Sequence, residues 1–156
     1  PLPKLRCPAT FEAWQDSSRW EALQPPDKLV SAADGQPVKL HTGSIAWHPW
    51  RQRWVTVFVQ EGGKPSALGE VWYAEAKSPI GLWGKAVKVL THENYTFYNP
   101  RLHPEFIGTN SPVLLFEGSY SQTFANRPQP TPRYDYNQML YRLDLDAPGL
   151  RPAQDR

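Results

Sequence analysis

The stretch RWVTVFVQ, residues 53–60, decides the fold class of this chain. Val55, Val57 and Val59 alternate with larger or polar residues, which is the two-residue period of a β-strand. Similar runs recur between turn signals, namely GSIAW (43–47), EVWYAEA (70–76), KAVKVLTH (85–92), PVLLFEGSY (112–120) and QMLYRLDLD (138–146). The sequence therefore predicts a mainly β chain with antiparallel strands.

The composition supports a loop-rich β protein with one short helix. The 156 residues include 17 Pro, 7 Trp, 7 Tyr and 6 Phe. Proline interrupts helices and central strands, whereas aromatic residues favour half-buried sheet surfaces. The one predicted helix lies within TFEAWQDSSRWEA (10–22), where Thr10 is a suitable N-cap and Pro25-Pro26 ends the element.

Two parts of the chain share one layout. His48-Pro49 precedes the strand of residues 53–60, as His103-Pro104 precedes the strand of residues 112–120. VWYAEAKSPIGLW (71–83) then matches MLYRLDLDAPGL (139–150). Small antiparallel meanders repeated about every 45–60 residues are typical of β-propeller blades. We therefore expect a partial β-propeller of about two four-stranded blades.

The expected blades span residues 42–97 and 98–150. Residues 1–41 would hold the helix, an extended connector and the end of a preceding blade, and residues 151–156 would form a tail. A propeller closes with about four to eight blades. We therefore expect further N-terminal blades or another protein chain to cover the open face. A β-sandwich is the alternative fold for the same strands.

The charge pattern excludes some partners. Basic and acidic residues number 17 and 15 and are interspersed, so no Lys/Arg run could neutralise a nucleic-acid backbone. Arg51 and Arg53 form the densest basic spot, which we interpret as a solvated turn. No apolar run approaches the ~20 residues that span a bilayer. Cys7 is the only cysteine, which leaves a buried thiol or a bond to another chain, and we favour the buried thiol.

Four motifs resemble a known family. They are GEVWYAEAKSPIGLW (69–83), YTFYNPRLHPEF (95–106), LLFEGSY (114–120) and PRYDYNQMLYRLDL (132–145). Over roughly residues 42–150 the chain resembles the C-terminal part of a family of uncharacterised bacterial secreted proteins, abundant in planctomycetes. That family is similar to glycosidase-type five-bladed propellers, a group that includes arabinanases and invertases. The resemblance implies a periplasmic or secreted propeller and no particular reaction.

In a propeller the innermost strand of each blade lines the central channel. FYNPRLH (97–103) would be such a strand, with GSI (43–45) as its counterpart in the preceding blade. Tyrosine rings stack on sugar faces, while Asn and Arg supply directional hydrogen bonds. The predicted ligand-binding residues of this strand are Tyr98, Asn99, Arg101 and His103. The competing interpretation, which we favour slightly, is that Asn99 and His103 satisfy backbone groups beside the prolines.

Glycoside cleavage ordinarily uses two carboxylates about 5–10 Å apart. Glu117 interrupts an apolar run and precedes a glycine, so it must be paired or face a cleft. Pairing with Arg101 or Arg133 would make Glu117 structural. Asp135 is the second candidate carboxylate, whereas we expect Glu70 and Glu75 to be structural or solvent-facing.

The loop that contains Asp135 supplies the remaining candidates. Long loops with aromatic and charged residues are frequent binding surfaces. The predicted binding residues there are Arg133, Tyr134, Tyr136 and Asn137, and the alternative is a loop anchored by packed tyrosines.

No motif for a phosphate loop, a nucleophile elbow or a zinc protease occurs, and we predict no metal or cofactor. The favoured function is a carbohydrate-binding or carbohydrate-active protein of the bacterial envelope or exterior, whose ligand is a glycan or another hydroxylated molecule. Whether it is an enzyme stays open, and an enzyme would resemble a glycoside hydrolase. The alternative is a non-catalytic scaffold or accessory subunit of a larger assembly.

Overall fold

The computed structural model describes residues 5–6, 10–16, 18, 21–22, 29–63, 68–80, 82–91, 96–122, 125 and 135–154. Near the N-terminus, β1 (Leu5–Arg6) pairs antiparallel with β2 (Glu21–Ala22), and α1 (Phe11–Gln15) lies between them in the chain. The predicted short helix is therefore present, at the start of the 10–22 segment. Cys7 lies outside the described residues.

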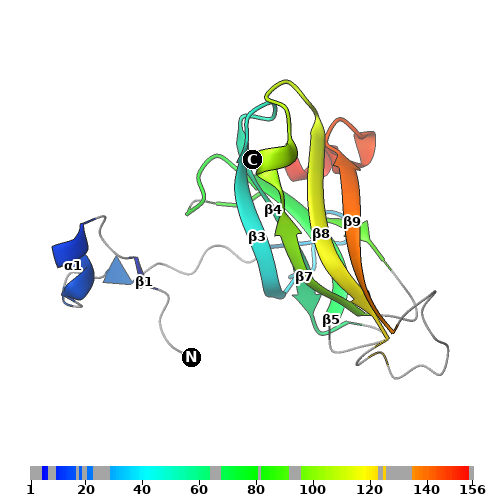
Figure 1. Ribbon diagram of the computed structural model, residues 1–156, viewed down its shortest axis with the longest axis horizontal. Helices are drawn as coiled ribbons and strands as arrows, with labels where there is room; N and C mark the ends of the chain where they lie inside the picture. Colours follow the sequence, from blue (N-terminus) through cyan, green and yellow to red (C-terminus); the bar gives the residue numbers. More distant parts are fainter. Residues whose placement is uncertain are drawn as a thin grey trace.

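Four consecutive strands form the first sheet (Figure 1). They are β3 (Leu40–His48), β4 (Arg53–Glu61), β5 (Leu68–Ala76) and β6 (Val87–Leu90), hydrogen-bonded in the order β3-β4-β5-β6 and all antiparallel. This is the meander that the alternating sequence predicted. The tight turn after β3 includes Gln52 at a φ of 50°, in the left-handed region.

The second sheet has three strands. They are β7 (Thr96–Leu102), β8 (Val113–Ser121) and β9 (Tyr136–Asp144), in the order β7-β8-β9, with the 3-10 helix η2 (Pro104–Phe106) between β7 and β8. Four strands were expected here. Instead of a fourth strand, the chain after β9 forms the 3-10 helix η3 (Pro148–Gln154), whose Pro148 and Pro152 cannot donate ladder hydrogen bonds. Helix η3 is packed against the first sheet, because it contacts β5 and β6 and its Leu150 and Ala153 are buried.

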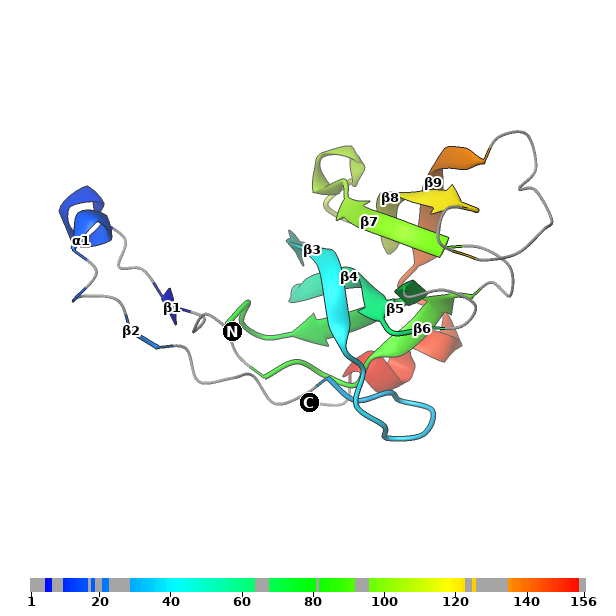
Figure 2. The ribbon, with the colours of Figure 1, turned by 90° about the horizontal axis from the view of Figure 1, so that it is seen from below.

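The two sheets pack face to face, with β7 lying against β3, β4 and β5 (Figure 2). The valines of RWVTVFVQ point into this interface, as their alternation predicted. The interface core consists of Val55, Val57, Val59, Val71, Tyr73, Phe97, Leu102, Leu114, Phe116, Leu145, Leu150 and Ala153. Each fully buried large apolar side chain contributes about 1.5–3 kcal/mol, so this core holds the sheets together.

The first sheet is covered on its other face as well. Phe58 and Trp72 point away from the second sheet and pack with Val38 and Ala86, with Leu29 against them. The segment that supplies Leu29 and Val38 is tied to the sheet by backbone hydrogen bonds, among them Ala86 N–H to the Val30 carbonyl at 2.7 Å. Strand β4 is therefore buried on both faces, and that explains why Phe58, which lies between Val57 and Val59, is also large and apolar.

One ion pair is buried at the end of the first sheet. Arg51 Nε donates to both carboxylate oxygens of Glu75, at 2.9 and 3.1 Å, and the Tyr73 hydroxyl donates to Glu75 Oε1 at 2.8 Å. Burial, together with the Glu75 charge, raises the pKa of Tyr73. The expected structural role of Glu75 is confirmed. The interpretation of Arg51 as solvated is wrong, because the buried carboxylate requires a charged partner.

Burial of Tyr141 is expected to make the free energy of unfolding sensitive to alkaline pH. Tyr141 stacks on Phe116 with ring centroids 5.0 Å apart, and burial raises its pKa from 10.0 to about 12. The folded state favours the neutral phenol, so this stabilisation is complete below pH 10.0 and is lost as the pH rises towards about 12. We expect Tyr141→Phe to show a shallower loss of unfolding free energy across this window, measured by urea denaturation at several pH values. An equally steep dependence of the unfolding free energy on pH in the two proteins would contradict this prediction. Tyr73, whose pKa is also raised by burial, leaves some pH dependence in both.

Candidate functional site

A β-bulge in β7 shapes the candidate site. Tyr98 pairs with Ser119 and Arg101 with Glu117, so Asn99 and Pro100 together face one residue, Gly118. Asn99 has a φ of 49°, a left-handed conformation that asparagine tolerates better than most residues. Proline lacks the N–H that a regular ladder needs, and this favours a bulge here. The bulge leaves Asn99 and Arg101 exposed on either side of a buried proline.

A cavity of about 420 Å³ lies beside this bulge, where β3 and β7 run side by side (Figure 1). It is lined by residues of four strands, namely Thr42, Gly43, Ser44, Asn99, Pro100, Arg101, Glu117, Ser119, Tyr136 and Gln138. On β8, Glu117 and Ser119 alternate with the buried Phe116 and Gly118, so their side chains point away from the core. We call these ten residues the β3–β7 cavity.

Glu117 is the carboxylate of the β3–β7 cavity. Its side chain is 32% exposed, and its ion-pair partner among the described residues is His103, whose Nε2 lies 3.4 Å from Glu117 Oε1. Arg101 is opposite Glu117 in the strand register, yet within the described part of the chain no arginine forms an ion pair with Glu117. Of the two arginine partners considered for Glu117, Arg101 does not form the pair and Arg133 lies outside the described residues. Glu117 and Arg101 both line the cavity, where a ligand can reach them.

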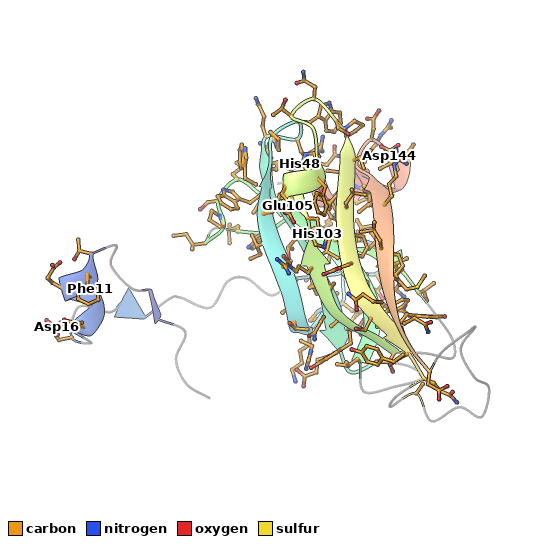
Figure 3. All side chains as sticks on the ribbon, viewed as in Figure 1. Phe11, Asp16, His48, His103, Glu105 and Asp144 are labelled. Carbon is orange, nitrogen blue, oxygen red and sulfur yellow. The ribbon has the colours of Figure 1, made fainter. Side chains whose placement is uncertain are left out.

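His103 lies behind Glu117 rather than in the cavity. It is buried and lies beside Glu105 (Figure 3), with its Nδ1 2.8 Å from Glu105 Oε1. Its ring stacks on Phe106 with centroids 5.2 Å apart. The hydrogen bond from His103 lowers the pKa of Glu105. The imidazole thus bridges Glu105 and Glu117. His103 is placed to orient Glu117 and does not itself line the β3–β7 cavity.

Tyr136, Ser119 and Gln138 form a hydrogen-bonded row along one wall. Ser119 Oγ lies 2.7 Å from the Tyr136 hydroxyl and 3.2 Å from Gln138 Oε1. Ser119 is itself buried beneath the two longer side chains. Its hydroxyl holds both in place, which fixes donors and acceptors around Glu117. Sequence reasoning missed Ser119 and Gln138, although a two-residue step from Glu117 along β8 would have indicated Ser119.

The remaining predicted residues lie outside this cavity. Tyr98 is exposed on β7, with its ring 6.1 Å from that of His41. Asn137 donates from Nδ2 to the Tyr120 carbonyl at 3.3 Å. Asp135 is exposed, and its backbone carbonyl accepts a hydrogen bond from Gln122 N–H. Gln122 directly follows β8 and is five residues from Glu117, a separation of roughly 16 Å at strand spacing. The structure does not bring Asp135 to Glu117. Arg133 and Tyr134 lie outside the described residues.

No cluster of three or more His, Cys, Asp or Glu side chains suited to a metal ion occurs in the part of the chain that the structure describes. Nor does any helix there reach the length and apolarity needed to cross a membrane. Glu117 is also the one carboxylate among the described residues that line the β3–β7 cavity. Two-carboxylate hydrolysis would need a second acid within about 10 Å facing the same cleft.

Comparison with known proteins yields a distant structural likeness. The fold is similar to part of an N-acetylgalactosamine deacetylase from F. plautii, solved in complex with blood group B trisaccharide. The TM-score is 0.48 and the identity 12%, over 79% of this chain and 37% of that chain, so this chain spans little more than a third of that structure. A likeness at this level carries no argument about function. No family model and no curated protein matches the chain, and the resemblance to the bacterial propeller family gains no support from them.

Proposed function

We propose that the β3–β7 cavity binds a carbohydrate. The observation on which the proposal depends is Glu117, a partly exposed carboxylate without an arginine partner among the described residues, placed opposite Arg101. A carboxylate accepts two hydrogen bonds from neighbouring hydroxyls, and a guanidinium donates to ring and hydroxyl oxygens. Asn99, Tyr136 and Gln138 add directional groups from three further positions. Such a ring of preset polar groups suits a polyhydroxylated ligand.

The proposal favours binding over hydrolysis by this chain alone, because the cavity offers one carboxylate among the described residues. The proposal also covers the architecture of the protein beyond these two sheets. The two sheets would be neighbouring blades of a propeller, with β3 and β7 as inner strands and further blades completing the site. The face-to-face packing and the adjacency of β3 and β7 support this arrangement. The protein would act in the periplasm or outside the cell, where bacteria meet polysaccharides.

A second candidate function is an accessory subunit of a larger assembly. It is favoured by apolar side chains exposed on one edge strand of each sheet, namely Ile45 and Trp47 on β3 and Met139 and Leu140 on β9. Exposed apolar side chains gathered on one face are typical of surfaces that meet a partner, and Ile45 and Trp47 lie on the same face of β3. Both functions are compatible with one molecule that binds a glycan within an assembly.

Glu117→Gln tests the carbohydrate site. We expect it to weaken binding of the best ligand from a panel of neutral oligosaccharides about 10- to 100-fold, because a charge-assisted hydrogen bond contributes roughly 1.5–3 kcal/mol. Isothermal titration calorimetry measures the affinity. Glu61→Gln is the matched control, since Glu61 is an exposed carboxylate paired with Lys39 and lies outside the cavity.

Asn99→Gly provides a second arm of the same test. Glycine adopts the left-handed conformation of residue 99 without strain, so the bulge is retained while the amide is lost. We expect weaker oligosaccharide binding with an unchanged unfolding midpoint. Unaltered affinity in both Glu117→Gln and Asn99→Gly, or the absence of any oligosaccharide ligand, would refute the proposal.

A further inference from the structure

A second, larger cavity lies on the face of the first sheet that points away from the second sheet. Its volume is about 700 Å³, against about 420 Å³ for the β3–β7 cavity. The segment of residues 31–38 forms one side, β5 and β6 form the floor, and Gly149 and Pro152 of the η3 region close one end. No residue is shared between the two cavities. We call this the outer cavity.

Glu70 on the floor of the outer cavity has an unsatisfied oxygen. Its Oε2 is buried and has no hydrogen-bond partner, whereas Oε1 lies 3.8 Å from Lys88 Nζ. A buried carboxylate oxygen without a donor costs roughly 1–3 kcal/mol or more. Nothing in the described fold offsets that cost at Oε2. The end torsion of a glutamate is soft, so the carboxylate can turn Oε2 towards a donor in the cavity.

The surroundings of Glu70 define what the donor would be. Trp72 and Ala86 form an apolar wall together with Val38. The Trp72 indole N–H already donates to Gln60 Oε1 at 2.9 Å, and the Gln60 amide donates to the Gly62 carbonyl at 2.9 Å, so these groups are occupied. The unsatisfied acceptor therefore lies beside an apolar surface.

The charges that face the cavity favour a cation. They are Glu70 and Lys88 on the floor and Asp34 on the rim. A hydrogen bond from Ser31 lowers the pKa of Asp34, which keeps its carboxylate ionised at neutral pH. Two carboxylates and one ammonium leave a net negative charge. Lys88 is also held over the Trp72 ring, 5.4 Å from its centroid.

We propose that the outer cavity is a binding site for a small organic amine with an apolar body. The ammonium group would donate to Glu70 Oε2 and face Asp34, while the apolar body would pack against Trp72. Lys88 would stay beside Glu70 Oε1. A neutral alcohol of the same shape would gain the apolar contact and lose the charge-assisted hydrogen bond.

Cyclohexylamine and cyclohexanol are suitable probes, because they share a ring and differ in the charged donor. We expect cyclohexylamine at pH 7 to shift the Trp72 indole N–H resonance, assigned through Trp72→Phe, and to bind at least about ten-fold more tightly than cyclohexanol. Glu70→Gln should abolish that preference. Glu61→Gln and Glu117→Gln should keep it, and the latter variant separates this site from the carbohydrate site.

Thermal unfolding supplies an independent readout. If Glu70 is a ligand-binding carboxylate, Glu70→Gln should leave the midpoint of the free protein unchanged or raise it by about 3 °C, since a buried carboxylate oxygen without a donor is removed and the long ion pair with the half-exposed Lys88 contributes little. A loss of several degrees would show that Glu70 is structural and would overturn the proposal. So would equal affinity for the two probes, or no binding of cyclohexylamine.

Discussion

Arg51→Met is expected to lower the free energy of unfolding by about 3 kcal/mol, because it leaves the Glu75 carboxylate buried without its cation. The Glu75 side chain is 2% exposed and that of Arg51 20% exposed, so water cannot solvate the stranded charge well. The Tyr73 hydroxyl still donates to Glu75, and together with the partial exposure of Arg51 this places the cost at the lower end of the usual range. Urea denaturation followed by circular dichroism measures the change.

Lys39→Met is the matched control for Arg51→Met. Lys39 pairs with Glu61 at 2.6 Å, yet the two side chains are 71% and 45% exposed. Exposed ion pairs contribute about 0–1 kcal/mol, so this variant should unfold almost as the parent protein does. Equal destabilisation by the two substitutions would show that burial does not distinguish the pairs. Arg51→Met combined with Glu75→Leu should recover part of the loss, because no charge is then left unpaired.

Phe116→Ala is expected to cost about 3–5 kcal/mol, the range for removing a buried aromatic side chain. Phe116 is 2% exposed on β8, belongs to the core between the two sheets and stacks on Tyr141. Its removal leaves a cavity in the contact that joins the sheets. Guanidinium denaturation, followed by both tryptophan fluorescence and circular dichroism, measures the loss and shows whether the sheets still unfold together.

Phe11→Ala carries the same chemical change on an exposed residue. Phe11 is 71% exposed in α1, so its truncation should alter the unfolding free energy by less than about 0.5 kcal/mol. A cost for Phe116→Ala as small as this would mean that the interface between the sheets is not the main core of the protein.

The strands were predictable because their signal is local. Val55, Val57 and Val59 alternate on β4 as a strand buried against another sheet requires, and Phe58 between them packs on the opposite face. The turn after β3 and the bulge of β7 also follow local chemistry, since a proline within a strand run indicates an irregular ladder. The missing fourth strand of the second sheet was harder to predict. A proline-rich segment after β9 was read as a turn and tail, although Leu150 and Ala153 anchor it in the core.

The candidate site was predictable in part. Asn99, Arg101, Glu117 and Tyr136 do line one cavity, because the bulge of β7 and the register of β8 and β9 bring them together. For His103 the sequence left ligand binding and a structural role open, and the structure places its imidazole between Glu105 and Glu117, outside the residues that line the cavity. Whether His103 lines the cavity or lies behind Glu117 depends on the direction of the chain at the His103-Pro104 step. There η2 begins and packs against β8.

Residue order alone therefore established an antiparallel β protein, its main strands and the polar character of β7, since alternation, turn chemistry and proline positions act over a few residues. The tertiary structure decided which strands adjoin. Thr42 and Ser44 line the same cavity as Arg101 only because the two sheets stack with β3 beside β7. The tertiary structure also decided that Arg51 pairs with Glu75 and that Glu70 Oε2 is left without a hydrogen-bond donor. Such meetings are set by the burial of apolar surface across long sequence separations, which no local pattern encodes.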